Sequence, residues 1–258
     1  MLDGRHQVMP ILEILKTLLL GYPVTPDMLD ADYPLLVQAF GGMLLTLVLT
    51  VISLTAGAIF GLVLAVMREA PIRPMSGGTI NPASIIARVV SSTAVGSVQG
   101  LPLMMIVLIV YYYPFVLFHA RMPGVLLAMV ALSVFAGAYM CEIIRSGFRA
   151  VDAGLVESAK VLGLSRSQTL WSLKIPLASR VMLPAIVGLA VTIFIDSSVL
   201  VVVAVPDLMY TARQMAMADP RHYPLIFGIV LAIYWTVASA GSVVVEHMER
   251  KWDMCISR

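Results

Sequence analysis

Five long apolar stretches, almost free of charged residues, constrain the fold of this chain more than any other feature. A helix of roughly 20 apolar residues spans the hydrocarbon core of a bilayer and satisfies its backbone hydrogen bonds internally. Hydrophobic residues make up 60% of the chain and charged residues only 12%. The pattern predicts an all-α integral membrane protein. Its five predicted transmembrane helices cover about residues 42–66, 102–119, 124–144, 181–205 and 223–245.

A polar interval at residues 152–176 interrupts the apolar stretches and is patterned like a helical hairpin. Asp152 can cap a first helix, and Gly163 can end it in the left-handed conformation that glycine tolerates. Ser165 and Gln168 have the capping-box spacing for a second helix, which Pro176 is expected to stop. These signals predict a compact knob of two short helices outside the bilayer. A rigid knob of this kind is suited to docking a partner protein.

The remaining segments divide the chain around this membrane domain. Residues 9–20 are apolar but too short to span a bilayer, and Glu13 and Lys16 interrupt them. We expect an interfacial amphipathic helix there rather than a signal peptide. Residues 83–98 are expected to form a weakly amphipathic helix that breaks before the second span. The predicted organisation is an N-terminal periplasmic or interfacial segment (1–40), a transmembrane domain (41–250) and a cytoplasmic tail (251–258).

The basic residues predict how the helices cross the membrane. With the knob in the cytoplasm, twelve of the 17 Lys and Arg residues fall in inner segments, in agreement with the enrichment of such residues in cytoplasmic loops. Five spans then place the N-terminus outside and the C-terminus in the cytoplasm. The inner basic residues are Arg68, Arg73, Arg88, Arg145, Arg149, Lys160, Arg166, Lys174, Arg180, Arg250, Lys251 and Arg258.

Asp196 is the one acidic residue near the middle of a predicted span. A charged side chain there costs roughly 2.5–3.5 kcal/mol on insertion scales, so a compensating role is expected. Gly188 and Thr192 precede it at intervals of four residues and share its helix face. Together with Ser197, these residues are candidates for a substrate path in which Asp196 holds an ammonium group. Alternatively, Asp196 caps a local helix break or bonds to the neighbouring serines.

Other polar residues give little evidence of chemistry in this chain. Glu142 and Arg145 lie three residues apart on a predicted helix, a spacing that favours a structural ion pair. Cys141 and Cys255 have no metal-site or disulfide spacing, and the chain lacks the G-x-x-x-x-G-K-[ST] sequence of nucleotide-binding loops. We therefore expect no catalytic residues, no metal site and no cofactor.

The knob sequence resembles the cytoplasmic EAA loop of ABC importer permeases. The family pattern is E-A-A, three residues, G, nine residues, I, one residue and L-P. Here E-S-A begins at Glu157, and the same spacing leads to Gly163, Leu173 and Ile175. The resemblance implies contact with ATPase subunits through Glu157, Ser158, Ala159, Gly163, Leu164, Ile175 and Pro176.

Three further segments resemble polar amino acid importer permeases, particularly glutamate/aspartate-type members. They are Q-G-L-P-L at 99–103, A-Y-M-C-E-I-I-R-S-G at 138–147 and D-S-S-V-L at 196–200. Their order and distances match the family. The resemblance implies the type I ABC importer (MetI-like) permease fold, with five transmembrane helices and a coupling helix in the cytoplasmic knob.

The function implied by this resemblance is import of a polar amino acid across the bacterial inner membrane. An external binding protein would deliver the substrate, an ABC ATPase dimer would bind ATP and Mg, and a second permease subunit would complete the pore. No nucleic acid is expected as a partner. Family members often carry Asn, Glu and Lys at the positions of Gly188, Leu189 and Ile195. The absence of these three polar side chains here fits an acidic or neutral substrate. It also fits a partner permease of different sequence that supplies most of the substrate site.

Two other functions remain open at this stage. A stand-alone secondary transporter or channel would need several intramembrane polar groups or inverted repeats, whereas this chain has one acidic residue near mid-span. A membrane-embedded enzyme would need a nucleophile with a base, or a metal cluster, which the sequence does not suggest. Copurification with an ATPase separates the importer from both alternatives.

Overall fold

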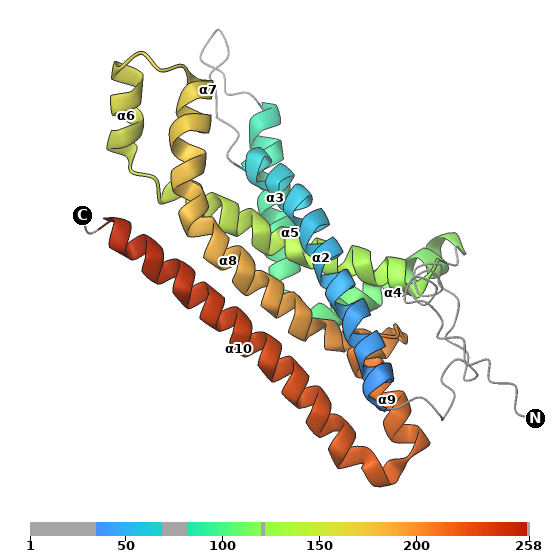
Figure 1. The fold of residues 1–258 in the computed structure, drawn as a ribbon. Coiled ribbons are helices and arrows are strands. Elements are labelled where there is room, and N and C mark those ends of the chain that lie inside the picture. The colour runs from blue at the N-terminus through green and yellow to red at the C-terminus, as the bar shows by residue number, and fades with distance from the viewer. Residues whose placement is uncertain (1–34, 69–81, 120–121, 257–258) are drawn as a thin grey trace, which may run out of the picture.

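The computed structural model describes residues 35–68, 82–119 and 122–256, which are helical throughout apart from short turns (Figure 1). The expected helix at 9–20 lies outside the described residues. The elements are α2 (Leu35–Arg68), α3 (Pro82–Gln99), α4 (Leu103–Phe118), α5 (Gly124–Arg149), α6 (Ala153–Val161), α7 (Arg166–Thr169), η2 (Leu170–Lys174), α8 (Ile175–Asp196), η3 (Ser197–Val203), α9 (Leu208–Ala218), η4 (Pro220–His222) and α10 (Tyr223–Ile256).

Helices α2 and α5 share the most extensive contact of any two described elements, and glycines bring their backbones together. A methyl group at Gly57 would lie 2.5 Å from the Cβ of Ala136, and one at Gly61 would lie 2.7 Å from the carbonyl oxygen of Gly137. Small residues allow such close approach between membrane helices. Gly57 and Gly61 therefore fix the packing of α2 against α5.

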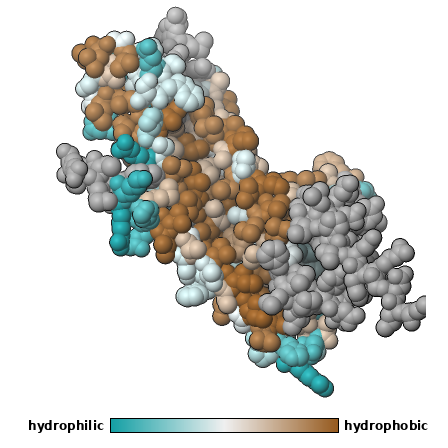
Figure 2. All heavy atoms as spheres, in the orientation of Figure 1, coloured by the Kyte–Doolittle hydropathy of each residue, from teal (hydrophilic) through white to brown (hydrophobic). Residues whose placement is uncertain are grey.

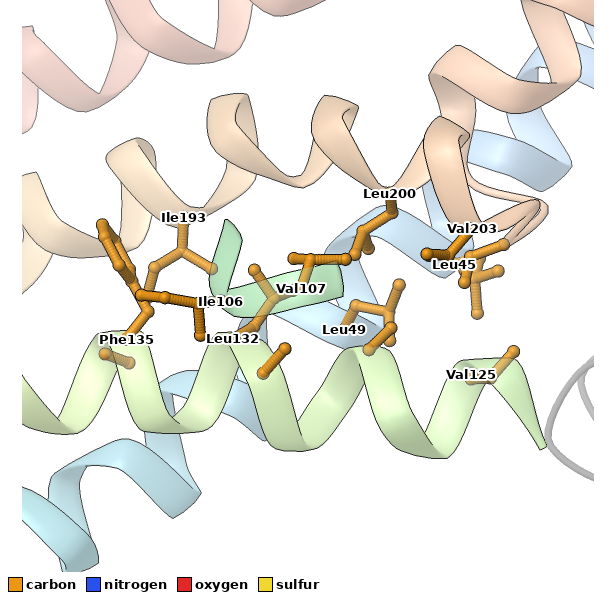
Figure 3. Close-up of a cluster of buried hydrophobic side chains, with 14 of the residues drawn as sticks. Leu45, Leu49, Ile106, Val107, Val125, Leu132, Phe135, Ile193, Leu200 and Val203 are labelled. Carbon is orange, nitrogen blue, oxygen red and sulfur yellow. The ribbon is translucent and has the colours of Figure 1, made fainter. Parts of the chain in front are cut away.

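The main hydrophobic core lies where α4, α8 and η3 meet this pair (Figure 3). Leu49 from α2, Leu132 from α5, Ile193 from α8 and Leu200 from η3 are all fully buried in it. Val107 from α4 completes the cluster. Side chains from five elements, spread from α2 to η3, thus pack around one centre.

Four described helices are long and apolar enough to span a membrane, and a fifth span requires α3 and α4 to count as one bent pair. The two helices meet at 108° across the break at Gly100, Leu101 and Pro102. The sequence predicted a span at 102–119 alone, but α4 has only 16 residues, about 24 Å at the rise of an α-helix. The five-span count therefore holds only if this broken helix pair counts as one span, whereas the all-α membrane fold is confirmed.

Pro176 does not end the second knob helix, so that prediction is wrong. The helical run continues from Ser167 to Val203 and includes the fourth apolar span. Residues 170–174 form a π-helical turn in which the Ile175 N–H donates to the carbonyl oxygen of Leu170, five residues back. Pro176 then occupies the first turn of α8, directly after the π-turn, and has no N–H to donate to the helical run. The knob is consequently joined directly to a membrane helix.

Helix α9 was not anticipated from the sequence. Asp207 caps it by accepting a hydrogen bond from the Tyr210 N–H at 2.8 Å. The Leu208 N–H donates to Thr46 Oγ1 at 3.1 Å, which anchors the start of α9 on α2. Apolar side chains of α9 pack with residues of α10 in a second buried cluster. The sequence feature that could have predicted this helix is the capping residue Asp207, which lies just beyond an apolar stretch.

The outer faces of the bundle are strongly apolar. The space-filling view shows a continuous hydrophobic surface across the bundle, with hydrophilic residues gathered towards its two ends (Figure 2). Leu231, Trp235 and Val243 of α10 are more than 60% exposed. This distribution matches a multi-pass membrane protein, because apolar side chains are stable against lipid. Helix α10 also runs to Ile256, through most of the predicted tail.

Candidate coupling knob and substrate path

The first helix of the knob is closed at both ends by the predicted residues. At the start of α6, Asp152 Oδ1 accepts a hydrogen bond from the Leu155 N–H at 3.1 Å. At its end, Gly163 has a φ of +79°, a conformation that only glycine adopts readily. The Leu164 N–H then bonds to the Ala159 carbonyl oxygen at 3.1 Å. This left-handed ending turns the chain sharply into the second helix.

The second knob helix begins with the predicted capping box. Ser165 N–H donates to Gln168 Oε1 at 2.9 Å, and Gln168 N–H donates to Ser165 Oγ at 3.3 Å. Two backbone donors at the helix start are thereby satisfied reciprocally. Ala159 of α6 and Thr169 of α7 are buried within the knob, and α6 packs on α7. The hairpin has a small core and two defined ends.

The corner of the knob carries an exposed apolar surface. Val161 is 87% exposed and Leu162 is 80% exposed, with Leu164 beside them at 37%. The upper end of the molecule in Figure 2 shows this hydrophobic patch among polar residues. Apolar patches rimmed by polar residues mark interaction sites. The sequence prediction included Leu164 but missed Val161 and Leu162, whose exposure follows from the left-handed turn at Gly163.

The predicted coupling residues divide between two places. Glu157 and Ser158 are exposed on α6, and Ala159 lies beneath them in the knob core. Ile175 and Pro176 lie beyond the π-turn, in the first turn of α8. The motif therefore covers both the exposed knob and its junction with the membrane helix.

The predicted pair of Glu142 and Arg145 is part of a larger ionic cluster. Arg145 Nη1 lies 3.1 Å from Glu142 Oε2. Arg68, at the end of α2, contacts the other oxygen of the same carboxylate. The Glu142 side chain thus links the end of α2 to α5. Spacing alone could indicate Arg145 but not Arg68, which is 74 residues away.

Three of the residues predicted for a substrate path share one face of α8. Thr192 is exposed, and Gly188 and Asp196 are partly exposed. Thr192 Oγ1 donates to the Gly188 carbonyl oxygen at 3.0 Å. Apart from the local helix backbone and the adjoining residues, no atom of the described residues lies within 4 Å of the position of a Cβ at Gly188. The face therefore combines open space, a hydroxyl group and a carboxylate. Asp196 is the last residue of α8, where the helix tightens into η3.

Ser197 lies apart from this face. It is fully buried, and its hydroxyl donates to the Phe194 carbonyl oxygen at 2.8 Å. Because Ser197 is one residue beyond Asp196 along the helix, its side chain points in a different direction and is buried in the bundle. The structure therefore brings together Gly188, Thr192 and Asp196 but not Ser197.

Asp207 is a buried acid that the sequence analysis did not single out. Its Oδ1 accepts the capping bond from Tyr210, while Oδ2 is buried without a hydrogen-bond partner in the described part of the chain. Burial raises the pKa of this carboxyl group to about 7, and its backbone hydrogen bonds oppose that shift.

No group of three or more His, Cys, Asp and Glu side chains suited to a metal ion occurs among the described residues.

Comparison with known proteins identifies the family. The family model for the binding-protein-dependent transport system inner membrane component matches residues 81–253. The probable glutamine ABC transporter permease GlnP of Bacillus subtilis is 30% identical over 81% of this chain and 90% of its own length. The glutamate/aspartate import permease GltK of Escherichia coli is 27% identical over 84% of this chain and 95% of its own length.

Solved structures give the same fold. An amino acid ABC transporter crystallised with histidines aligns with a TM-score of 0.72 and 27% identity, covering 83% of this chain and 94% of that chain. The MetNI methionine ABC transporter in an inward-facing conformation aligns with a TM-score of 0.65 at 18% identity, covering 84% and 99%. The expected MetI-like permease fold is confirmed. The chain belongs to the family of inner membrane components of binding-protein-dependent transport systems, and it is an ABC transporter permease whose matched relatives include amino acid permeases.

Proposed function

We propose that this chain is a pore-forming subunit of an ATP-driven importer for a polar amino acid. The observation that carries the proposal is the knob, a capped helical hairpin that exposes Val161 and Leu162 and continues directly into membrane helix α8. ATPase subunits would bind this surface, and their movement would be transmitted along α8. This chain itself would perform no ATP chemistry.

The substrate class rests on the relatives and on one helix face. The matched permeases are named for glutamine, cystine, glutamate/aspartate and arginine, all of which carry an α-ammonium group and an α-carboxylate. On α8 of this chain, Asp196 is suited to the ammonium group and Thr192 to a hydrogen bond with the substrate. Acidic amino acids are included in the proposed substrate class, because this face of α8 carries no acidic residue besides Asp196 that would repel them.

The proposed assembly contains partners on three sides. Two ATPase subunits with ATP and Mg would lie at the knob end, and an external binding protein would deliver substrate at the opposite end. A second permease subunit, different from this chain, would complete the substrate site. In this arrangement the N-terminus lies outside and the C-terminus lies in the cytoplasm, in accordance with the distribution of basic residues.

The exposed corner of the knob gives the direct test. Leu162→Asp should abolish copurification of the ATPase subunits, because a carboxylate would be desolvated in an apolar contact. Leu162→Met keeps the apolar surface and should retain the ATPase. The measurement is the stoichiometry of the complex purified in detergent from cells that express all subunits. Copurification of the ATPase with the Leu162→Asp variant at the wild-type level would contradict the proposed docking surface.

A further inference from the structure

The π-helical turn η2 separates two rigidly packed parts of the chain. On the knob side, Thr169 is buried and its hydroxyl donates to the Ser165 carbonyl oxygen at 3.0 Å. On the membrane side, Ala178 is completely buried against α5, where a Cβ at Gly147 would lie 3.2 Å from the Ala178 carbonyl oxygen. Between these two anchors, no residue of η2 is buried.

The hydrogen-bond pattern also departs from that of an α-helix in this interval. An α-helix bonds each N–H to the carbonyl four residues back, but Ile175 bonds to Leu170, five residues back. Pro176 follows with no N–H to donate. A π-turn corresponds to one extra residue within an α-helix and is frequently found at functional sites. The joint is therefore less constrained than the helices on either side.

The knob has few other attachments to the bundle. Helix α6 packs mainly on α7, and α7 packs mainly on η2 and α6. The second covalent connection is the short segment between Arg149 and Asp152. Movement of the knob relative to α8 must consequently be absorbed at these two connections, and only η2 is continuous with the helix that carries Thr192 and Asp196.

We propose that η2 is the pivot about which the knob turns relative to the membrane helices, and that its extra residue is required for coupling rather than for ATPase docking. This inference rests on the proposed function. Movement of an ATPase on the knob would change the angle at Leu170–Lys174 while the clamp at Ala178 and Gly147 holds α8 in the bundle. The two sides of the turn would then act as rigid arms.

The first test removes the extra residue from the intact transporter. Deletion of Ser172 should convert the π-turn into an α-helical register while the helix faces on both sides keep their directions. Ser172→Ala is the matched control, because it preserves the chain length and the turn. The deletion variant should bind ATPase subunits and hydrolyse ATP, but transport should fall by roughly tenfold or more. The pivot proposal would be contradicted if the deletion variant transported at the wild-type rate. It would also be contradicted if the deletion variant no longer bound the ATPase subunits.

The second test measures the movement itself. Spin labels are attached at cysteines introduced at Ala153 and Arg180 in a cysteine-free background, within the complex in nanodiscs. Addition of ATP with Mg should change the distance between the labels in the complex with the wild-type η2 sequence and in the Ser172→Ala variant. The change should be much smaller after Ser172 is deleted. An unchanged distance with the wild-type η2 sequence, while the ATPase is bound, would contradict the pivot proposal but not the proposed function. Absence of any ATPase from the wild-type complex would instead contradict the proposed function itself.

Discussion

At the scale of single residues, the molecule places two acids in contrasting environments. Asp196 ends α8 on a partly exposed face beside Thr192, whereas Asp207 is fully buried at the start of α9. The first is partly exposed, as its proposed contact with a substrate requires. The second caps a helix through one oxygen and has its other oxygen buried without a partner among the described residues. The two carboxyl groups therefore predict different responses to the same Asp-to-Asn change.

The Asp207→Asn variant should change how stability depends on pH. Burial raises the pKa of Asp207 to about 7 in the folded protein, whereas an unfolded Asp has a pKa of about 3.9. The folded state therefore binds the proton more tightly, so this group's contribution is fully present below about pH 4 and declines as pH rises towards 7. Asn keeps the cap and cannot ionise. Its melting temperature relative to wild type should rise between pH 4 and 7 and then remain constant.

The control for this measurement is Asp219→Asn. Asp219 is exposed, and its hydrogen bond to His222 lowers its pKa, so the variant should not reproduce the rise seen with Asp207→Asn. Melting temperatures of the purified proteins in detergent across pH 4–9 give the comparison. A constant difference between Asp207→Asn and wild type across this range would show that Asp207 is ionised in the folded protein.

The Asp196→Asn variant should weaken transport without affecting ATPase binding. If the carboxylate holds the ammonium group of the substrate, loss of its charge removes a charge-assisted hydrogen bond of roughly 1.5–3 kcal/mol. The apparent affinity for substrate should fall by at least tenfold in concentration-dependent uptake. Ser198→Ala, a change at the neighbouring η3 residue, provides the control. Uptake equal to wild type at all concentrations would assign Asp196 a structural role.

At the scale of elements, the knob depends on one backbone conformation. Gly163 has a φ of +79°, and the turn there fixes the angle between α6 and α7. Gly163→Val should disrupt the corner, because a β-branched residue is strongly disfavoured at positive φ. Gly163→Asn is the control, since Asn tolerates this conformation better. Both proteins should insert into the membrane, but only the Asn variant should retain the ATPase. Normal ATPase binding by Gly163→Val would show that the corner does not define the docking surface.

Local signals explain which elements could be predicted from the sequence. The knob was predictable because its caps are encoded within a few residues, from Asp152 to Leu155 and from Ser165 to Gln168. The continuation of the helix through Pro176 could not be predicted, because a π-turn depends on how two helical segments are rotated relative to each other and not on a particular residue type. The break between α3 and α4 was expected before the second span, but the 108° angle between the two helices is a property of the packed bundle.

At the scale of the whole molecule, composition predicted the all-α membrane fold, but long-range contacts assembled its sites. Arg68 joins Glu142 across 74 residues, and Thr46 anchors Leu208 across 162 residues. Neither contact has a sequence signature. The resulting bundle holds the knob at one end and α9 at the other (Figure 1). The proposed function uses this arrangement, with ATP hydrolysis at the knob end and substrate entry at the opposite end.

Transport by the reconstituted complex tests the central claim most directly. The chain is placed in proteoliposomes with its ATPase subunits, its partner permease and the external binding protein, and uptake of radiolabelled polar amino acids is measured. Uptake should require ATP with Mg on the knob side and the binding protein on the opposite side, and it should be lost with the Leu162→Asp variant. Equal uptake by this chain alone without ATP would contradict the account and identify a stand-alone transporter or channel.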